Sequence, residues 1–177
     1  MPRKNEIDML HGPLLAKIII FAMPLAASSI LQQLFNSVDV AVVGRFDSSY
    51  ALAAVGSNGP VISLLINLFL GISMGANVVI SNHIGQKDNN LTKYAIRTTA
   101  ATALFSGLAL AVIGVLAARP ILTIMGTPTE VLDMAVRYLR IYFIGTPFLL
   151  IYNFGSAILR SKGDTSRPLY ILIVAGI

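Results

Sequence analysis

The sequence predicts an all-α fold, a polytopic bundle of transmembrane helices, and three observations support this. Of the 177 residues, 55% are hydrophobic and only 12% are charged, whereas about 25% of the residues of a typical soluble domain are charged. A soluble chain of this length could not bury so much apolar surface, because small domains leave much of their surface in contact with solvent. The apolar residues also form runs of about 20 residues or more, the length that a helix needs to cross a bilayer.

Composition also excludes several classes of function. The chain has no cysteine, which excludes disulfide frameworks and thiolate metal sites. The net charge is +5, but the basic residues lie in short breaks between apolar runs without an aromatic-rich basic face, so we expect no nucleic-acid partner. His11 and His83 have no metal-ligand partner three or four residues further on. No phosphate-binding glycine loop, nucleophile elbow or carboxylate pair is present, so we expect neither an enzyme nor a bound cofactor.

The runs place the helices in order within one membrane domain. We expect them at about residues 18–43, 54–82, 95–117 and 131–159, with a fifth at 168–177. The first run is too long, and too polar in its second half, for a cleaved signal peptide. The apolar run of this last helix, Leu169 to Ile177, has nine residues, which cover only about 14 Å of a hydrocarbon core of about 30 Å. We therefore expect the natural protein to continue and this chain to be its N-terminal portion.

Short polar segments predict the turns between these helices. Gly85 is suited to the left-handed conformation that ends a helix, and Asn90 or Thr92 can cap the next helix. The stretch GTPTEV predicts a cap at Thr127. Gly163, in RSKGDTSRPLY, is expected to end the fourth helix before the fifth begins.

The distribution of basic residues predicts the orientation in the membrane. If the N-terminus is cytoplasmic, the cytoplasmic side holds Arg3, Lys4, Lys17, Lys87, Lys93, Arg97, Arg160, Lys162 and Arg167. The opposite side then holds Arg45, Arg119, Arg137 and Arg140. Because cytoplasmic segments carry an excess of Lys and Arg, we expect a cytoplasmic N-terminus and a multi-pass protein of the plasma (cell inner) membrane.

A polar stripe follows the second half of the first predicted helix. Ser28, Gln32, Asn36 and Asp39 are spaced so that they share one helical face. An aspartate at the bilayer centre costs about 2.5–3.5 kcal/mol, so this face should contact protein or water instead of lipid. We predict that Asp39 takes up a cation or a proton in an aqueous cavity that Gln32 and Asn36 help to line. The alternative is a structural hydrogen-bond partner, or a residue that reaches the headgroups.

Two further polar seams lie on the second and fourth predicted helices. Asn67 and Asn77 belong to a seam with helical spacing, which either lines a cavity or joins helices through hydrogen bonds worth roughly 0.6–2 kcal/mol. On the fourth helix, Tyr138 is a candidate for the membrane interface. Tyr152 and Asn153 lie deeper and are candidates for the cavity.

Pro24 lies inside the first predicted helix. A proline there removes a backbone donor and usually bends the helix. It precedes Asp39 by 15 residues, or about 22 Å of helix. Broken helices near polar seams are typical of transporter sites, although a bend that only serves packing explains the proline equally well.

Four stretches resemble the multidrug and toxic compound extrusion (MATE) transporters. They are FAMPLAASSILQQLFNSVDVAVVGRF, ALAAVGSNGP, LFLGISMGANVVISNHIGQKD and NFGSAILRSKGDTSRP. They occur in the family's order and cover nearly the whole chain. One mild departure is Ser161, where the family most often has alanine.

The resemblance implies a twelve-helix transporter of two six-helix lobes, of which this chain is most of the first. Such a protein exports small amphipathic or cationic compounds in exchange for Na⁺ or H⁺, and its partners are the lipid bilayer and the second lobe. Asp39 then corresponds to the functionally important aspartate of the family's first helix, and Pro24 to the proline linked to its bending. Tyr138 and Asn153 fall near polar positions of the cavity. The family's fifth helix adds an asparagine and an aspartate beyond Ile177.

Two alternatives remain. A lipid-linked oligosaccharide flippase of the same superfamily would need cationic side chains in its cavity, whereas the intramembrane charge here is the carboxylate of Asp39. A membrane scaffold subunit that does not transport would use its polar seams to pair helices. Thiol labelling of a cysteine scan distinguishes a water-lined seam from a helix-pairing one.

Overall fold

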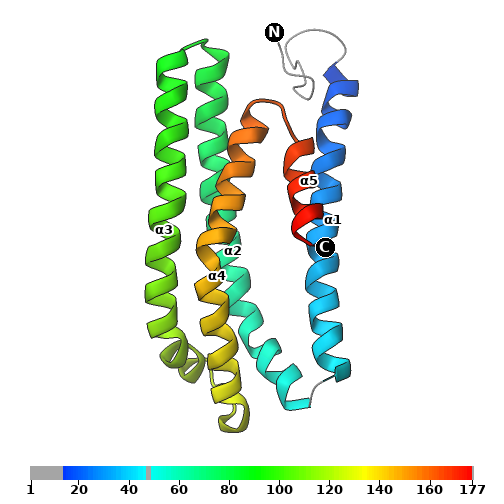
Figure 1. Cartoon of the computed structure of the whole chain (residues 1–177), viewed down its shortest axis with the longest axis vertical. Coiled ribbons are helices and arrows are strands. Elements are labelled where there is room, and N and C mark those ends of the chain that lie inside the picture. The colour runs from blue at the N-terminus through cyan, green and yellow to red at the C-terminus, as the bar shows by residue number, and fades with distance from the viewer. Residues whose placement is uncertain (1–13, 47–48, 177) are drawn as a thin grey trace. The chain divides into compact units, whose positions relative to one another are not determined.

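The computed structural model describes residues 14–46 and 49–176, and it is helical apart from short turns. The side chains of Leu14, Asp39, Phe46 and Ser49 lie outside this description. The helices are α1 Leu14–Phe46, α2 Ser49–Gly85, α3 Asn89–Ile124, α4 Thr129–Ser161 and α5 Ser166–Ala175 (Figure 1). Within the described ranges, α1 to α4 are long and apolar enough to cross a membrane.

The four long helices extend beyond the ranges expected from hydropathy. They contain 33, 37, 36 and 33 residues, which at about 1.5 Å per residue gives lengths of about 50–55 Å. A hydrocarbon core of about 30 Å therefore leaves roughly 10 Å of each helix outside the core at either end. Hydropathy identified the apolar centres of these helices, but helix ends are determined by turn geometry and capping.

The α2–α3 turn differs from the sequence-based expectation. Lys87, and not Gly85, adopts the left-handed conformation, with φ of 57°. The side chain of Asp88 accepts hydrogen bonds from the backbone N–H groups of Asn90 and Leu91, at 3.0 and 2.9 Å. Asp88 therefore caps α3 in place of Asn90 or Thr92, because its carboxylate can accept from two free N–H groups of the first turn.

The α3–α4 and α4–α5 turns each contain a glycine in the left-handed conformation. Gly126 between α3 and α4 has φ of 73°, and Gly163 between α4 and α5 has φ of 81°. After Gly163 comes Asp164, whose side chain is almost fully buried and accepts a hydrogen bond from the backbone N–H of Arg167 at 3.1 Å. The Arg167 guanidinium also pairs with Asp164 at 2.9 Å, which neutralises a carboxylate that would be costly to bury alone.

The chain forms two compact units, and each of the four long helices contributes a segment to both. Of the described residues, the first unit contains 14–37, 73–99 and 154–176, and the second contains 38–46, 49–72 and 100–153.

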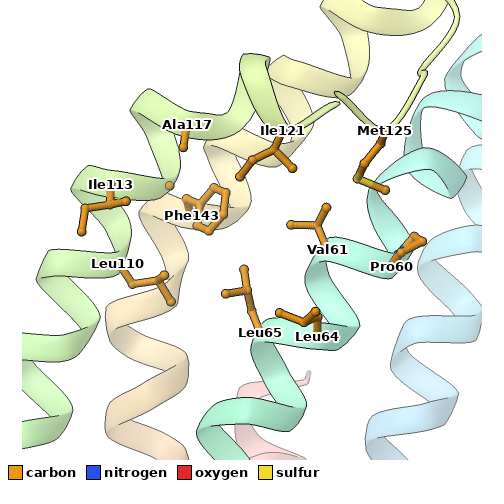
Figure 2. Close-up of a pocket in the computed structure, with 11 residues that line it drawn as sticks. Pro60, Val61, Leu64, Leu65, Leu110, Ile113, Ala117, Ile121, Met125 and Phe143 are labelled. Carbon is orange, nitrogen blue, oxygen red and sulfur yellow. The ribbon is translucent and has the colours of Figure 1, made fainter. Parts of the chain in front are cut away.

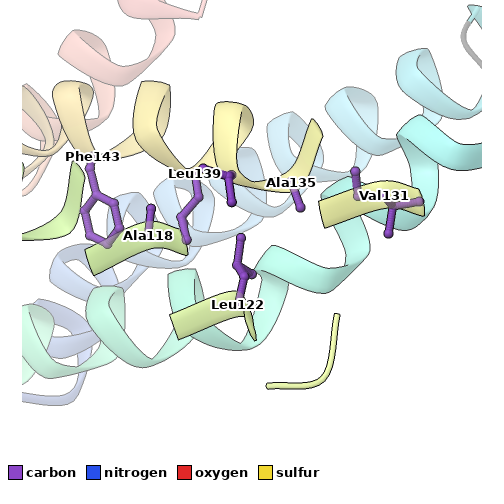
Figure 3. Close-up of a cluster of buried hydrophobic side chains, with 8 residues drawn as sticks. Ala118, Leu122, Val131, Ala135, Leu139 and Phe143 are labelled. Atoms are coloured by element: carbon purple, nitrogen blue, oxygen red, sulfur yellow. The ribbon is translucent and has the colours of Figure 1, made fainter. Parts of the chain in front are cut away.

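In the second unit, α4 packs between α2 and α3 through small and medium-sized side chains. Figure 3 shows Phe143, Leu139 and Ala135 of α4 beside Ala118 and Leu122 of α3. The complete buried cluster is Ala54, Ala118, Leu122, Val131, Ala135, Val136, Leu139 and Phe143. Small residues at such contacts let helix backbones approach closely, which is how helices associate where water supplies no driving force.

Two glycines of α3 show how close α3 and α4 are. A Cβ atom added at Gly107 would lie 2.8 Å from the Cα atom of Pro147, and one added at Gly114 would overlap the Phe143 ring. Only glycine fits at these two contacts without a shift of α4.

In the first unit, α2 packs against α4 around Ser73, Ile80 and Ala157, none of which is exposed. The side-chain amide of Asn77 on α2 donates a hydrogen bond to the carbonyl of Ala157 at 2.8 Å. The end of α5 lies against α1, where Gly176 faces the ring of Phe35.

Candidate functional site

The predicted polar stripe lies on α1. Gln32 and Asn36 are exposed, so the packing of this chain leaves both amides available. Asp39 belongs to the same helix seven residues before its last residue, or about 10 Å from that end. The side chain of Asp39 lies outside the described residues.

Pro24 and Ser28 form a local hydrogen-bonding arrangement in the first half of α1. Pro24 is half-buried inside the helix and has no N–H to donate to the preceding turn. The hydroxyl of Ser28 donates to the Pro24 carbonyl at 2.8 Å. Serine bonds of this kind, four residues back, often bend helices, so both residues favour a bend at this turn of α1.

The two asparagines predicted on α2 have different surroundings. Asn67 is exposed. Asn77 is half-buried, and its amide N–H₂ group is bound to the Ala157 carbonyl. The structure therefore brings Asn77 into a helix–helix contact and leaves Asn67 available to other groups.

On α4, Tyr138 and Tyr152 are half-buried and Asn153 is 7% exposed. Asn153 lines a cavity of about 10 Å³ together with Tyr142 and Thr146. That volume is about the space of one water molecule. This part of α4 can hold a water molecule between polar groups, but the cavity is too small for an organic substrate.

A larger cavity lies between α2, α3 and α4 in the second unit, with a volume of about 480 Å³. Figure 2 shows Val61 and Leu65 of α2 facing Phe143 of α4 and Ile121 of α3 across it. Its lining is apolar: Pro60, Val61, Leu64, Leu65, Leu110, Ile113, Gly114, Ala117, Ile121, Met125 and Phe143. None of the predicted polar site residues lines it, so it suits an apolar group and not an ion.

Asn58 is a buried polar residue that the sequence analysis did not single out. It is 0% exposed, and its amide N–H₂ group donates to the carbonyls of Ala54 at 2.8 Å and Ala135 at 3.1 Å. Its side-chain oxygen has no hydrogen-bond partner among the described residues. The sequence indication was available: an asparagine stands two residues before Pro60 in an apolar helix.

Within residues 14–46 and 49–176, no group of three or more His, Asp or Glu side chains is arranged to hold a metal ion.

The fold agrees with comparisons to known proteins. The MatE family model matches residues 24–177 of the chain. The chain belongs to the MatE family. It is a multi-pass membrane protein of the MATE multidrug efflux family, whose members are transporters and not enzymes.

Curated relatives support this assignment over most of the chain. The probable multidrug resistance protein YoeA of Bacillus subtilis (strain 168) is 36% identical over 156 residues, which cover 88% of this chain and 34% of YoeA. The multidrug export protein MepA of Staphylococcus aureus (strain MRSA252) is 25% identical, over 80% of this chain and 31% of MepA. The chain thus spans about a third of the length of these relatives.

Solved structures share the fold. A MATE transporter in the straight conformation superposes with a TM-score of 0.83 at 25% identity, covering 90% of this chain and 35% of that one. The bent conformation gives a TM-score of 0.82 at 25% identity, covering 90% and 36%. An outward-facing multidrug resistance MATE transporter gives 0.87 at 23% identity, covering 99% and 38%.

Proposed function

We propose that this chain acts as the first lobe of a secondary antiporter that exports small amphipathic or cationic compounds in exchange for Na⁺ or H⁺. The observation that carries the proposal is the combination on α1 of a bend site at Pro24 with a polar stripe whose amides, Gln32 and Asn36, stay exposed in this chain. The N-terminus is cytoplasmic in this proposal, as the distribution of Lys and Arg indicates.

Asp39 is the exchangeable charge in this proposal. An ionised carboxylate inside a membrane requires a partner, and Na⁺ or a proton supplies one. Uptake of either ion changes which hydrogen bonds the carboxylate can make with the amide side chains on its face, and so favours one arrangement of α1. A similar MATE transporter has been solved in a straight and a bent conformation, and we assign the corresponding bend here to the turn of Pro24 and Ser28.

Binding of the ion and binding of the substrate are coupled if each shifts the conformational equilibrium of α1. An ion that stabilises one conformation of α1 and a substrate that stabilises the other lower each other's affinity, and this effect is reciprocal. Couplings of this kind are typically about 1–3 kcal/mol, or about 5- to 150-fold in affinity. The substrate binds in the lobe that holds this helix, with Asn67, Tyr138, Tyr152 and Asn153 as candidate contacts.

The test is export from proteoliposomes that contain the complete transporter with Asp39→Asn, under an imposed Na⁺ or H⁺ gradient. We expect the variant to bind substrate but to lose gradient-driven export, and the gradient that drives the wild type identifies the ion. Glu130→Gln, which neutralises an exposed carboxylate in the first turn of α4, is the matched control and should export normally. Normal export by a folded, inserted Asp39→Asn variant would refute the coupling role.

The Asn77–Ala157 hydrogen bond favours a second candidate, a scaffold subunit whose polar seams only pair helices. These 177 residues contain no cysteine, so single cysteines can be introduced here and labelled against the same protein without the introduced cysteine. A transporter predicts that Gln32→Cys and Asn36→Cys react with a water-soluble thiol reagent. The control Leu108→Cys, at an exposed apolar position that we expect to face lipid, should not react. A scaffold predicts that neither position on α1 reacts.

A further inference from the structure

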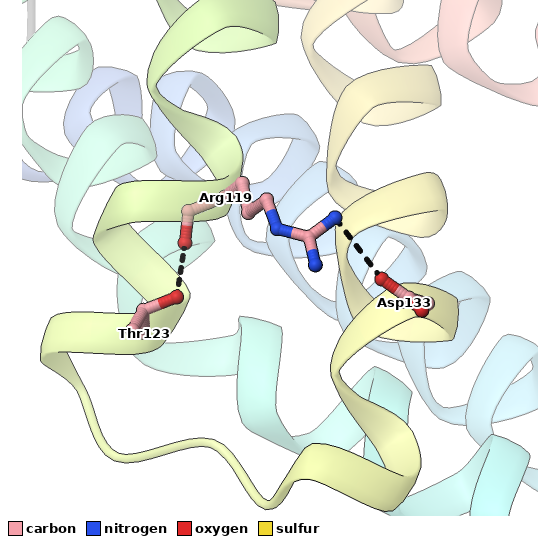
Figure 4. A network of polar contacts seen from close by, with 3 residues as sticks. All are labelled: Arg119, Thr123 and Asp133. Atoms are coloured by element: carbon pink, nitrogen blue, oxygen red, sulfur yellow. Dashed lines mark hydrogen bonds and ion pairs between the residues drawn. The ribbon is translucent and has the colours of Figure 1, made fainter.

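Three arginines and one aspartate meet on α3 and α4 near the turn that joins these helices. A guanidinium nitrogen of Arg119 lies 3.2 Å from a carboxylate oxygen of Asp133 (Figure 4). The Nε–H group of Arg140 donates to the backbone carbonyl of Val115 at 3.2 Å. Both contacts cross from one helix to the other, and both lie within the second compact unit.

Arg137 completes the cluster, which we call the arginine cluster: Arg119, Asp133, Arg137 and Arg140. Arg137 follows Asp133 by four residues and precedes Arg140 by three, so helical geometry places it on the same side of α4. Its side chain is exposed and has no hydrogen-bond or ion-pair partner among the described residues. The cluster holds three guanidinium groups and one carboxylate, and the only ion pair within it is Arg119–Asp133, so among the described residues neither Arg137 nor Arg140 has an ion-pair partner.

The depth of the cluster matches the level of lipid headgroups. Arg137 lies eight residues after the start of α4 and Arg119 five residues before the end of α3, or about 12 and 8 Å from those helix ends. Because roughly 10 Å of each helix extends beyond the hydrocarbon core, these guanidinium groups lie close to its boundary. Arg140 lies about one turn deeper, from where an arginine side chain reaches the headgroups.

An apolar surface continues from the cluster toward the membrane centre. On α4, Ile144 and Phe148 follow Arg140 at helical spacing and are 62% and 75% exposed. On α3, Val112 and Leu116 are 62% and 73% exposed beside Val115. A cationic patch at headgroup depth therefore adjoins an apolar face at acyl-chain depth. This arrangement matches a phospholipid, whose charged headgroup is followed by apolar acyl chains.

We propose that the arginine cluster binds the phosphate of an anionic glycerophospholipid, with an acyl chain lying against Ile144 and Phe148. Guanidinium groups suit this role because their planar N–H donors match phosphate oxygens in pairs. The charge balance favours an anionic lipid over a zwitterionic one. The exposed apolar face favours a lipid over a soluble anion, since free phosphate would gain nothing from contact with it. This proposal does not depend on antiport.

The test is native mass spectrometry of the natively expressed protein released from phosphatidylcholine nanodiscs that contain a minor fraction of phosphatidylglycerol. We expect phosphatidylglycerol to be retained preferentially, and Arg137→Gln to lower that preference about fivefold, the effect of about one surface cation on an anionic lipid. Arg137→Lys should keep most of it. Asp133→Asn removes the competing carboxylate and should raise the preference severalfold.

Arg97→Gln is the matched control, because Arg97 is exposed and lies eight residues from the other end of α3, at the same distance from a helix end as Arg137. It should leave the retained lipid unchanged. Equal retention of phosphatidylglycerol by wild type and Arg137→Gln would overturn the proposal. So would displacement of the lipid by inorganic phosphate, which would make the cluster a soluble-anion site. Because Arg137 is exposed and makes no hydrogen bond or ion pair with the described residues, its substitution should not prevent folding.

Discussion

Helices α1 and α4 have equal lengths, but α4 is largely packed against the rest of the chain whereas α1 is mostly exposed. In the most apolar window of α4, 39% of the residues are buried, against 6% in α1. α4 presents a face of buried side chains to α2 and α3. α1 exposes large apolar residues and the amides of Gln32 and Asn36. The difference teaches that α4 organises the packing of this chain, whereas α1 has a surface left for other partners.

The largest expected effect lies at the centre of the α4 contacts. Phe143 is 1% exposed and lines the cavity between α2, α3 and α4, and Phe143→Ala should lower the free energy of unfolding by about 3–5 kcal/mol, since it removes buried contacts and enlarges this cavity. Leu34→Ala on α1, where Leu34 is 54% exposed, should change it by less than about 0.5 kcal/mol. Unfolding in mixed micelles of increasing denaturing-detergent content measures both. Equal losses of unfolding free energy for the two variants would show that α1 and α4 do not differ in packing.

A second substitution tests the same contact from α3. Gly114→Ala places a methyl group where the Phe143 ring lies, and overpacking of this kind typically costs about 1–3 kcal/mol. Gly71→Ala on α2 is the control, because an added Cβ would meet nothing within 4 Å. The same unfolding assay should show a loss only for Gly114→Ala. An unchanged stability would mean that α3 and α4 separate easily.

The third prediction concerns the polar contact between α2 and α4. Asn58→Asp replaces an N–H₂ donor by an oxygen that faces the Ala54 and Ala135 carbonyls, and it should destabilise the protein by about 1–3 kcal/mol. Asn36→Ala, on the exposed face of α1, adds no charge and should cost less, because it breaks no buried hydrogen bond. Thermal unfolding in a mild detergent compares the two. A larger loss for Asn36→Ala would show that α1 is the more tightly packed helix.

The smallest expected effect is that of the ion pair at the ends of α3 and α4. The side chains of Arg119 and Asp133 are 60% and 83% exposed, so a double-mutant cycle with Arg119→Gln and Asp133→Asn should give a coupling of only about 0.2–1 kcal/mol. The coupling should fall at high salt. A value above this range would indicate that the pair is shielded from water in the membrane.

Much of the fold could be predicted from the sequence because hydropathy and helical periodicity are local properties. The apolar runs predicted long membrane-spanning helices, and the placement of Pro24 and of the polar residues on α1 follows from spacing within one helix. The resemblance to MATE transporters rested on motifs in the correct order, and it is confirmed by the family match over residues 24–177. The roles of Asp39 and of the cavity residues stay predictions.

Only the tertiary structure decided which polar side chains have a hydrogen-bond partner on another helix. Asn67 and Asn77 look alike in the sequence, yet only Asn77 meets a carbonyl of α4. The close approach of α3 to α4 is evident only in the structure, where Gly114 lies against the ring of Phe143. The physical reason is that a pattern along one helix defines its faces, whereas the partner of each face depends on neighbours that are distant in the chain.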